Sequence, residues 1–268
     1  MLKKAIAIAI TLPILGLGNA AIAADESSSA EATGGKDWNV SVGLKLWRND
    51  WNLPLYTDSQ AIEYHSNTEL TIIPVLSARY NNWMVSGSYF SKTDYSFGFN
   101  QIAFKDGSTY PDVSITAERT EFDINVGYSV LPSLVVTLGY KQIDRKYSIL
   151  QFGNTIPNTD QDNKTSGFTL GFAASAPLSD QIGLYGSFGY GLNVKTKSLD
   201  GTYDTDYYLG EVGLSYGKIL EGVPVLDSAS AYIGYRVQAL VDHNDFYSGA
   251  STLADYTQGF VIGANLSF

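Results

Sequence analysis

Apolar residues alternate with small or polar residues along most of this chain, and this two-residue period limits the fold more than any other feature. In residues 182–194 one alternating set is Ile182, Leu184, Gly186, Phe188, Tyr190, Leu192 and Val194. The residues between them are mainly Gly, Ser and Asn. Successive side chains of a strand point to opposite faces, whereas a helix would mix the two sets. The body of the chain is therefore predicted to be all-β.

The alternation predicts ten strands, most of them longer than the roughly five or six residues usual in globular proteins. They cover about residues 38–47, 68–80, 83–95, 115–130, 133–143, 164–176, 181–194, 203–217, 228–240 and 255–268. Such lengths suit strands that cross a bilayer at a tilt, which takes about 9–11 residues. Beyond the first residues, no segment is apolar for long enough to form a transmembrane helix.

The connections between these strands alternate in length. One set is predicted at 81–82, 131–132 and 177–180, which are short, and at 218–227, which is longer; the other set is long, at 48–67, 96–114, 144–163, 195–202 and 241–254. Short turns at one end and long loops at the other are typical of an up-and-down transmembrane β-barrel. We expect ten antiparallel strands, with eight or twelve as alternatives, and both termini in the periplasm. A soluble β-sandwich is the competing fold, and the long strands argue against it.

Two details of the strands lead to local expectations. Pro74 falls inside the second predicted strand and has no N–H to donate, so a bulge or weakened pairing is expected there.

Amphipathic aromatic rings settle at membrane interfaces. We expect one girdle near the short turns, with Tyr80, Trp83 and Tyr128, and one near the long loops, with Tyr89, Tyr147, Tyr207, Tyr208 and Tyr256.

Composition excludes several classes of site. The chain has no Cys and only two His, so it has neither a disulfide scaffold nor a Cys nucleophile, and we expect no metal site and no cofactor. The formal net charge is −10, which argues against nucleic acid as a partner.

The first residues have the pattern of an export signal. Lys3 and Lys4 precede a short apolar stretch, and Ala21-Ile22-Ala23 has the small-x-small form of a cleavage site. Residues 1–23 are therefore predicted to be a signal peptide, because the apolar run is too short for the alternative, a membrane anchor. Residues 24–37 read as a flexible periplasmic leader and residues 38–268 as the barrel.

The end of the chain carries the most specific signal. Counting back by twos from the last residue gives an apolar set: Phe268, Leu266, Ala264, Ile262 and Phe260. This resembles the last strand of Gram-negative outer-membrane β-barrels, a broad group that includes small porin-like and opacity-type proteins. The resemblance implies a cell outer-membrane location, contact with membrane lipid and lipopolysaccharide, and recognition of this strand by the barrel-assembly machinery. Leu266 stands where the group usually has an aromatic residue.

Because successive side chains of a strand point to opposite faces, the positions between the apolar residues face the inside of the barrel, and they include charges of both signs. The predicted lumen set is Lys45, Arg79, Arg119, Glu121, Asp123, Lys141, Glu211 and Arg236. These residues either form an ion-pair network that plugs the lumen, since buried charges must be paired, or line a narrow polar pore. The leading functional prediction is passive passage of small solutes or ions. The alternative is a plugged structural or adhesive barrel that acts through acidic, aromatic outer loops.

A third reading is a hydrolase at the outer rim. His65 and His243 fall in the first and last long loops, and Asp242 and Asp245 flank His243. The ten-stranded omptin proteases use acidic pairs with a His at this rim, and outer-membrane lipid-modifying enzymes also use His. No clear second acidic pair is present here, so we expect no enzyme and no catalytic residue, with these four residues as the weak candidates.

Overall fold

The computed structural model describes residues 38–56, 61–103, 109–151, 160–199, 201–220, 223, 225–243 and 254–268. The predicted signal peptide and the predicted leader lie outside these ranges. Among the described residues there is no helix long and apolar enough to cross a membrane.

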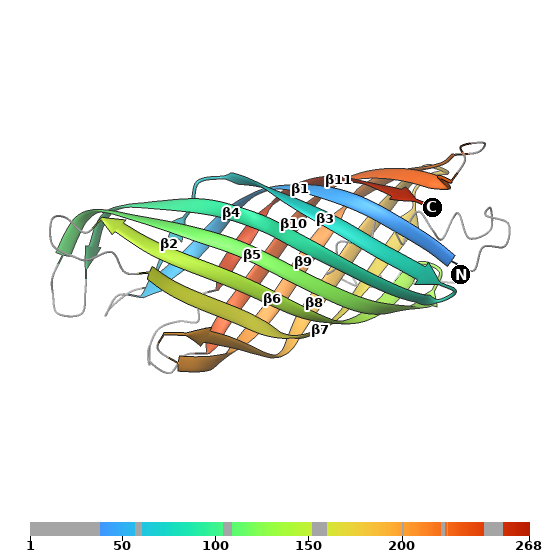
Figure 1. Cartoon of the computed structure of the whole chain (residues 1–268). Coiled ribbons are helices and arrows are strands. Elements are labelled where there is room, and N and C mark those ends of the chain that lie inside the picture. Colours follow the sequence, from blue (N-terminus) through green and yellow to red (C-terminus); the bar gives the residue numbers. More distant parts are fainter. Residues whose placement is uncertain are drawn as a thin grey trace, which may run out of the picture.

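The described residues form eleven strands joined in one antiparallel sheet (Figure 1). The strands are β1 (Trp38–Tyr56), β2 (Ala61–His65), β3 (Glu69–Tyr80), β4 (Trp83–Ala103), β5 (Thr109–Leu131), β6 (Leu134–Gln151), β7 (Asp160–Pro177), β8 (Ile182–Ser198), β9 (Gly201–Ile219), β10 (Ser228–His243) and β11 (Asp255–Ser267).

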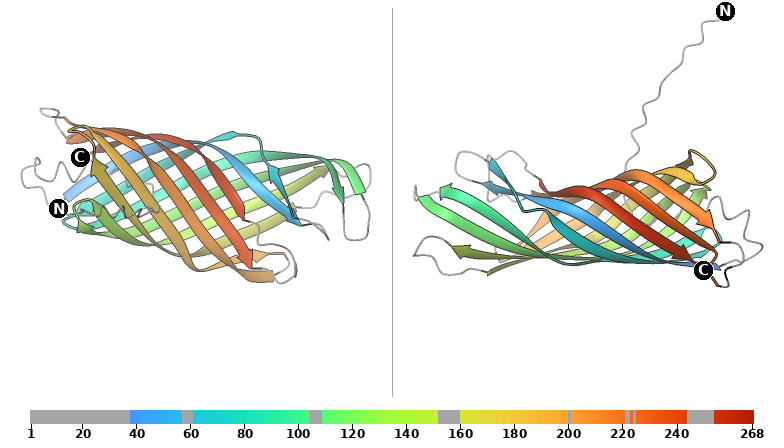
Figure 2. Two further views of the ribbon diagram at one scale, coloured as in Figure 1. Left: turned by 180° about the vertical axis from the view of Figure 1, so that it is seen from behind. Right: turned by 90° about the horizontal axis from the view of Figure 1, so that it is seen from above.

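The sheet closes on itself because the first and last strands pair. β1 pairs with β11 from Ser41 opposite Ser267 to Asn52 opposite Tyr256. The short strand β2 pairs only with the far part of β1 and continues the line of β3, so ten strands make the wall of the barrel. The prediction of a ten-stranded up-and-down barrel is confirmed, and eight and twelve are excluded. Figure 2 shows the strong tilt of the strands from two further sides.

The two ends of the barrel differ, as expected. At one end, the turn end, β1 begins, β11 stops, and tight turns connect β3 to β4 and β5 to β6. Asn81 in the first of these turns has φ 51°, a conformation that Asn tolerates better than most residues. At the other end, the hairpin end, β4, β5 and β6 extend far beyond the predicted strands.

The predicted long loops are therefore largely strand, and this is a correction. Within the membrane the apolar residues face outward, as Phe122 and Ile124 of β5 do. Toward the hairpin end the phase reverses, and Ile115 and Ala117 of the same strand point inward. The outer face there no longer meets lipid and becomes polar. The face that carries the apolar residues therefore changes along strands such as β1, β4 and β5, and this change made their continuation look like a loop.

Pro74 weakens the pairing of β3 with β4, as predicted, although it makes no bulge with β1. It lies opposite Leu44 in an unbroken β1–β3 ladder. The β3–β4 ladder runs only from Tyr80 opposite Trp83 to Val75 opposite Ser88. Every other ladder in the wall is longer, so this is the weakest seam among the described strands.

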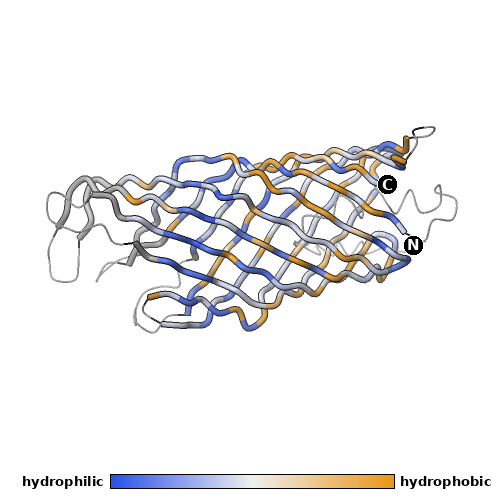
Figure 3. Tube along the Cα trace, in the orientation of Figure 1, coloured by the Kyte–Doolittle hydropathy of each residue, from blue (hydrophilic) through white to orange (hydrophobic). Residues whose placement is uncertain are grey.

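Apolar residues gather in the half of the barrel nearer the turn end (Figure 3), and those with exposed side chains, such as Val40, Val42 and Leu76, form an apolar belt on the outer surface. Exposed aromatic residues lie at the turn end, where Trp38 stacks near Tyr80 and Trp83 near Tyr128. A second exposed set lies farther along the strands: Tyr89, Phe122, Tyr140, Phe168, Tyr208, Tyr235 and Phe260. Two members predicted for that girdle, Tyr147 and Tyr207, are instead buried inside because they occupy inward positions.

Candidate functional site

The first interior cluster surrounds Glu211, which points into the barrel from β9. Its Oε2 atom accepts hydrogen bonds from Lys45 Nζ and Arg236 Nη1, both at 3.0 Å. Its Oε1 atom accepts one from the Tyr185 hydroxyl at 3.1 Å. Lys45 and Glu211 are each 1% exposed. Because these side chains come from β1, β8, β9 and β10, one carboxylate links four strands.

The second cluster surrounds Glu121 on β5. Its Oε1 atom accepts from Arg119 Nε at 2.7 Å and from Gln238 Nε2 at 2.8 Å, and Lys141 Nζ lies 2.6 Å from Oε2. Arg119 also donates to Thr257 Oγ1 at 2.5 Å. This network joins β5 and β6 to β10 and β11, which are not their neighbours in the sheet.

Aromatic side chains fill the space between the charges. The Arg236 guanidinium lies 5.0 Å from the centre of the Trp47 ring, and that of Arg119 lies 5.3 Å from the Trp51 ring. Such contacts stabilise a desolvated cation. One contiguous buried cluster draws residues from seven strands: Trp47, Ile73, Val75, Phe90, Ala173, Tyr185, Tyr232 and Val261. Side chains therefore meet across the lumen and leave it packed at this level.

A third cluster lies toward the hairpin end. Asp255 on β11 pairs with Arg145 on β6 and accepts a hydrogen bond from Trp51 Nε1 at 2.5 Å. Trp51 packs edge-to-face on Tyr95, so the ion pair lies beneath an aromatic layer. Sequence reasoning missed Arg145 and Asp255. Arg145 fell in a predicted loop, and the signal that could have found it is that every second residue from Lys141 onward, Ile143 and then Arg145, continues to face inward.

A chain of hydroxyl groups connects this cluster to the wall. Arg145 donates to Thr165, Thr165 meets Thr196 at 2.7 Å, Thr196 meets Thr205 at 2.7 Å, and Thr205 donates to Asp242 at 2.8 Å. A guanidinium only donates and a carboxylate only accepts. Each hydroxyl hydrogen must therefore point toward Asp242. The chain crosses β6 to β10 and was also missed, because Thr196 and Asp242 lay in predicted loops.

Of the remaining predicted lumen residues, Arg79 lies apart from these clusters, and Asp123 lies at the edge of the second one. Arg79 donates to Ser129 Oγ at 2.8 Å and to the Asn81 carbonyl at 3.1 Å, close to the turn end. Asp123 accepts from Ser88 at 2.7 Å and lies 3.5 Å from Lys141 Nζ.

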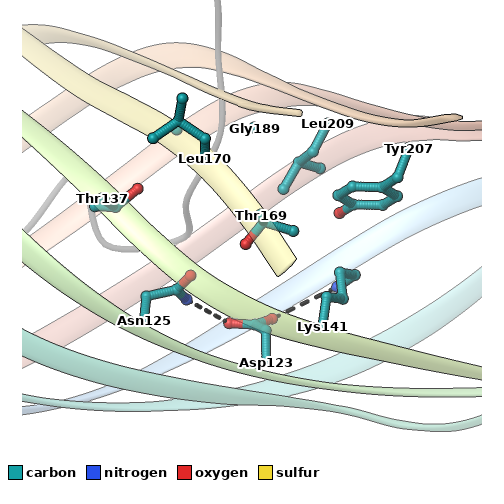
Figure 4. Close-up of a pocket in the computed structure, with 10 residues that line it drawn as sticks. Asp123, Asn125, Thr137, Lys141, Thr169, Leu170, Gly189, Tyr207 and Leu209 are labelled. Carbon is teal, nitrogen blue, oxygen red and sulfur yellow. Dashed lines mark hydrogen bonds and ion pairs between the residues drawn. The ribbon is translucent and has the colours of Figure 1, made fainter. Parts of the chain in front are cut away.

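Beside Asp123 the interior contains a small cavity of about 10 Å³ (Figure 4). Asp123, Lys141 and Thr169 are among the residues that line it. This volume is room for about one water molecule and too small for a continuous solute path.

The two histidines are not brought together. His65 lies opposite Asn52, and following the ladders across β1 and β11 leads to Ala239, four residues before His243. Three strand spacings of about 4.8 Å therefore separate the two histidine strands, in addition to that offset. The two rings are too far apart to share one substrate atom.

The acidic neighbours of His243 are also divided. His243 Nε2 lies 3.0 Å from Asp206 Oδ2 on the outer face of the barrel. Asp242 points to the other face and binds Thr205. Asp245 lies outside the described residues. Sequence reasoning missed Asp206 as the partner of His243, because it pairs from β9 across the ladder.

Four of the five residues of the predicted assembly signal share one face of β11, and Phe268 follows its end. Phe260, Ile262, Ala264 and Leu266 are exposed on the outer surface. Phe268 is bonded through its backbone to Val40 at the closing seam. The strand therefore presents an apolar face that lies beside β1.

Comparison with solved structures agrees with this fold, whereas two comparisons by sequence found no match. No protein-family profile matches the chain, and no curated protein matches it by sequence. The outer-membrane protease OmpT of Escherichia coli is similar in structure, with TM-score 0.51 and 15% identity over 88% of this chain and 97% of that one. The Pseudomonas putida toluene transporter TodX has TM-score 0.36 and 10% identity, with 95% of each chain covered.

A further similar structure is Ail, the attachment invasion locus protein of Yersinia pestis, in complex with the heparin analogue sucrose octasulfate. It has TM-score 0.35 and 9% identity, covering 87% of this chain and all of that one. The closed ten-stranded barrel with its apolar belt defines an outer-membrane β-barrel protein of the Gram-negative type. It belongs in the cell outer membrane.

Proposed function

We propose that this protein is a plugged outer-membrane barrel that acts through its hairpin end, and not a pore. The observation that carries the proposal is the pairing of Glu121 and Glu211, each with two cations, at 3% and 1% exposure. Charges that lined a water-filled path would be hydrated and exposed, whereas these are desolvated and matched. The geometry thus favours the alternative over passive passage, which was the leading prediction from sequence.

The hairpin end has the stiffness that a binding surface needs. Trp51, Tyr95, Phe97 and Tyr147 form a buried core inside it, with Leu53 and Tyr64 packed against them. A packed core holds the projecting strands in one arrangement, which lowers the entropic cost of binding a partner. We propose that the surface carried by these strands, together with the acidic loop residues, contacts that partner.

Conductance across a planar bilayer tests the plug. The wild-type protein is expected to leave the membrane silent, while Glu121→Ala, which removes the carboxylate that Arg119 and Lys141 share, is expected to produce current. Glu118→Ala is the matched control, because Glu118 is on the same strand but faces outward and pairs with the exposed Lys92. Stable current through the folded wild-type barrel would overturn the proposal and restore passive passage.

Hydrolysis is a second candidate, favoured by the contact between His243 and Asp206. A carboxylate 3.0 Å from an imidazole is the pairing that orients a general base. His243→Ala would abolish a peptidase or lipase activity measured on intact cells, while His65→Ala would leave it unchanged. Equal activity of both variants would remove His243 from consideration.

A further inference from the structure

The seam between β3 and β4 contains a window in the backbone ladder. On its turn-end side the ladder stops where Val75 pairs with Ser88. On its hairpin-end side the two chains meet again, because Asn67 N donates to the Ser96 carbonyl at 3.0 Å and Ser96 N to Asn67 Oδ1 at 2.6 Å. Between these points, residues 69–74 have no ladder partner on β4 among the described residues.

Side chains bridge the window at two places. On the outside, Ser91 donates through its hydroxyl to the Ile72 carbonyl at 2.7 Å. On the inside, the hydroxyls of Thr71 and Thr93 meet at 2.9 Å. Near these contacts β4 is also irregular against β5, with a register shift between Phe90 and Thr93. Backbone groups without partners are costly in hydrocarbon, so the remaining polar edges of this window need a partner other than alkyl chains.

An apolar groove of about 470 Å³ lies directly on the turn-end side of the window. It is on the lipid-facing surface, and its lining includes Pro74, Leu76, Ala78, Val85, Gly87 and Tyr89. Ala78 and Gly87 are the smallest of these lining residues. Ligand pockets commonly have volumes of about 300–1,000 Å³, so the groove can hold part of one small molecule.

The apolar groove and the polar window follow each other from the turn end toward the hairpin end of the barrel. The apolar groove is nearer the turn end, which is expected to face the periplasm because outer-membrane barrels have their short turns there, and the polar window is nearer the hairpin end. A lipid of the outer leaflet has the same order, with its acyl chains inward and its ester or amide linkages toward the outside.

We propose that the β3–β4 seam binds one lipid of the outer leaflet. Its acyl chain lies in the groove over Ala78 and Gly87, and its polar linkage bonds the backbone groups of residues 69–74. Pro74 has a role in this arrangement, because a residue without an N–H ends the ladder where the linkage must enter.

Two glycines provide a matched test. A Cβ added at Gly87 meets only the Asp123 carbonyl oxygen at 3.4 Å, and one at Gly186 meets only the Glu211 carbonyl oxygen at 3.8 Å. Both lie on outward positions of the barrel, so the fold accommodates a side chain at either. Gly87→Leu fills the groove, whereas Gly186→Leu places the same side chain on a distant part of the wall.

The experiment is native mass spectrometry of the full-length protein extracted from membranes in mild detergent. Wild type is expected to retain one bound lipid. Gly87→Leu is expected to lose it, and Gly186→Leu is expected to keep it. Ala78→Leu, with Ala231→Leu as its control, repeats the test from β3. The mass of the retained species distinguishes a phospholipid from a glycolipid.

Heat-dependent gel mobility checks that each variant has folded before its lipid content is compared. The proposal is overturned if the folded wild type retains no lipid. It is also overturned if the groove-filling variants and their controls retain lipid to the same extent, because the bound molecule would then lie elsewhere on the barrel.

Discussion

Lys45 on β1 and Glu211 on β9 meet inside the barrel, with Lys45 Nζ 3.0 Å from Glu211 Oε2, although 166 positions separate them in the chain. Both side chains are buried, and Arg236 shares the same carboxylate. Opposite charges in a desolvated interior attract strongly, but each is costly if its partner is lost. This contact is therefore a sensitive test of how the buried charges contribute to stability.

Glu211→Ala is expected to lower the free energy of unfolding by about 3–5 kcal/mol, because Lys45 and Arg236 would be left buried without their anion. Urea-induced unfolding in lipid vesicles measures the change. Glu118→Ala serves as the comparison, since its pair with Lys92 is solvent-exposed and such pairs contribute about 0–1 kcal/mol. Equal losses in the two variants would contradict a buried, mutually dependent network.

Thr196→Val tests the directed chain of hydroxyls. The substitution keeps the shape of the side chain but removes a group that both accepts from Thr165 and donates to Thr205. Leaving buried groups unsatisfied is expected to cost about 1–3 kcal/mol in the same unfolding measurement. Thr202→Val, at an exposed position of β9, should change stability little. An unchanged free energy of unfolding in Thr196→Val would show that the chain of hydroxyl groups does not contribute to stability.

Gly213→Ala is expected to prevent folding. An added Cβ would lie 2.2 Å from the Ile233 carbonyl oxygen and 2.7 Å from the Tyr185 ring, which holds the hydroxyl that bonds Glu211. Gly98→Ala is the control, because nothing lies within 4 Å of the added atom there. Folding yield in detergent, followed by heat-dependent gel mobility, reports the difference. Normal yield of Gly213→Ala would mean that the interior is loosely packed.

Phe268→Ala is expected to slow assembly into the outer membrane, if the last strand is read by the assembly machinery as its resemblance implies. The measurement is the folded fraction in cells after a pulse of synthesis. Phe122→Ala, which removes an exposed aromatic residue from β5, controls for lost lipid contact. Assembly that is slowed equally by both substitutions would argue against a special role for the chain end.

Much of the membrane-embedded barrel could be predicted because lipid imposes a simple rule on each strand. Where residues such as Val40 and Leu44 face hydrocarbon, every second position is apolar and most of the positions between them are small or polar. The rule fails toward the hairpin end, where the apolar set moves inward to Trp51, Tyr95 and Phe97. No local pattern marks that reversal, because it depends on where the wall leaves the lipid.

The candidate site was predictable only as a set of inward charges. Parity placed Lys45, Glu121 and Glu211 in the interior, but it could not say which charges touch. The weak seam at Pro74 was visible in sequence, whereas the groove beside it depends on how β3, β4 and β5 lie together.

The sequence by itself determined the strand period, the turn end and the two faces of the wall, since these follow from which side of each residue meets lipid. The tertiary structure alone decided whether the lumen is open or filled. Closure of β1 on β11 brings side chains from distant strands to within hydrogen-bond distance. The pairing of Lys45 with Glu211 is a property of that closed geometry, because neither residue carries any local mark of the other.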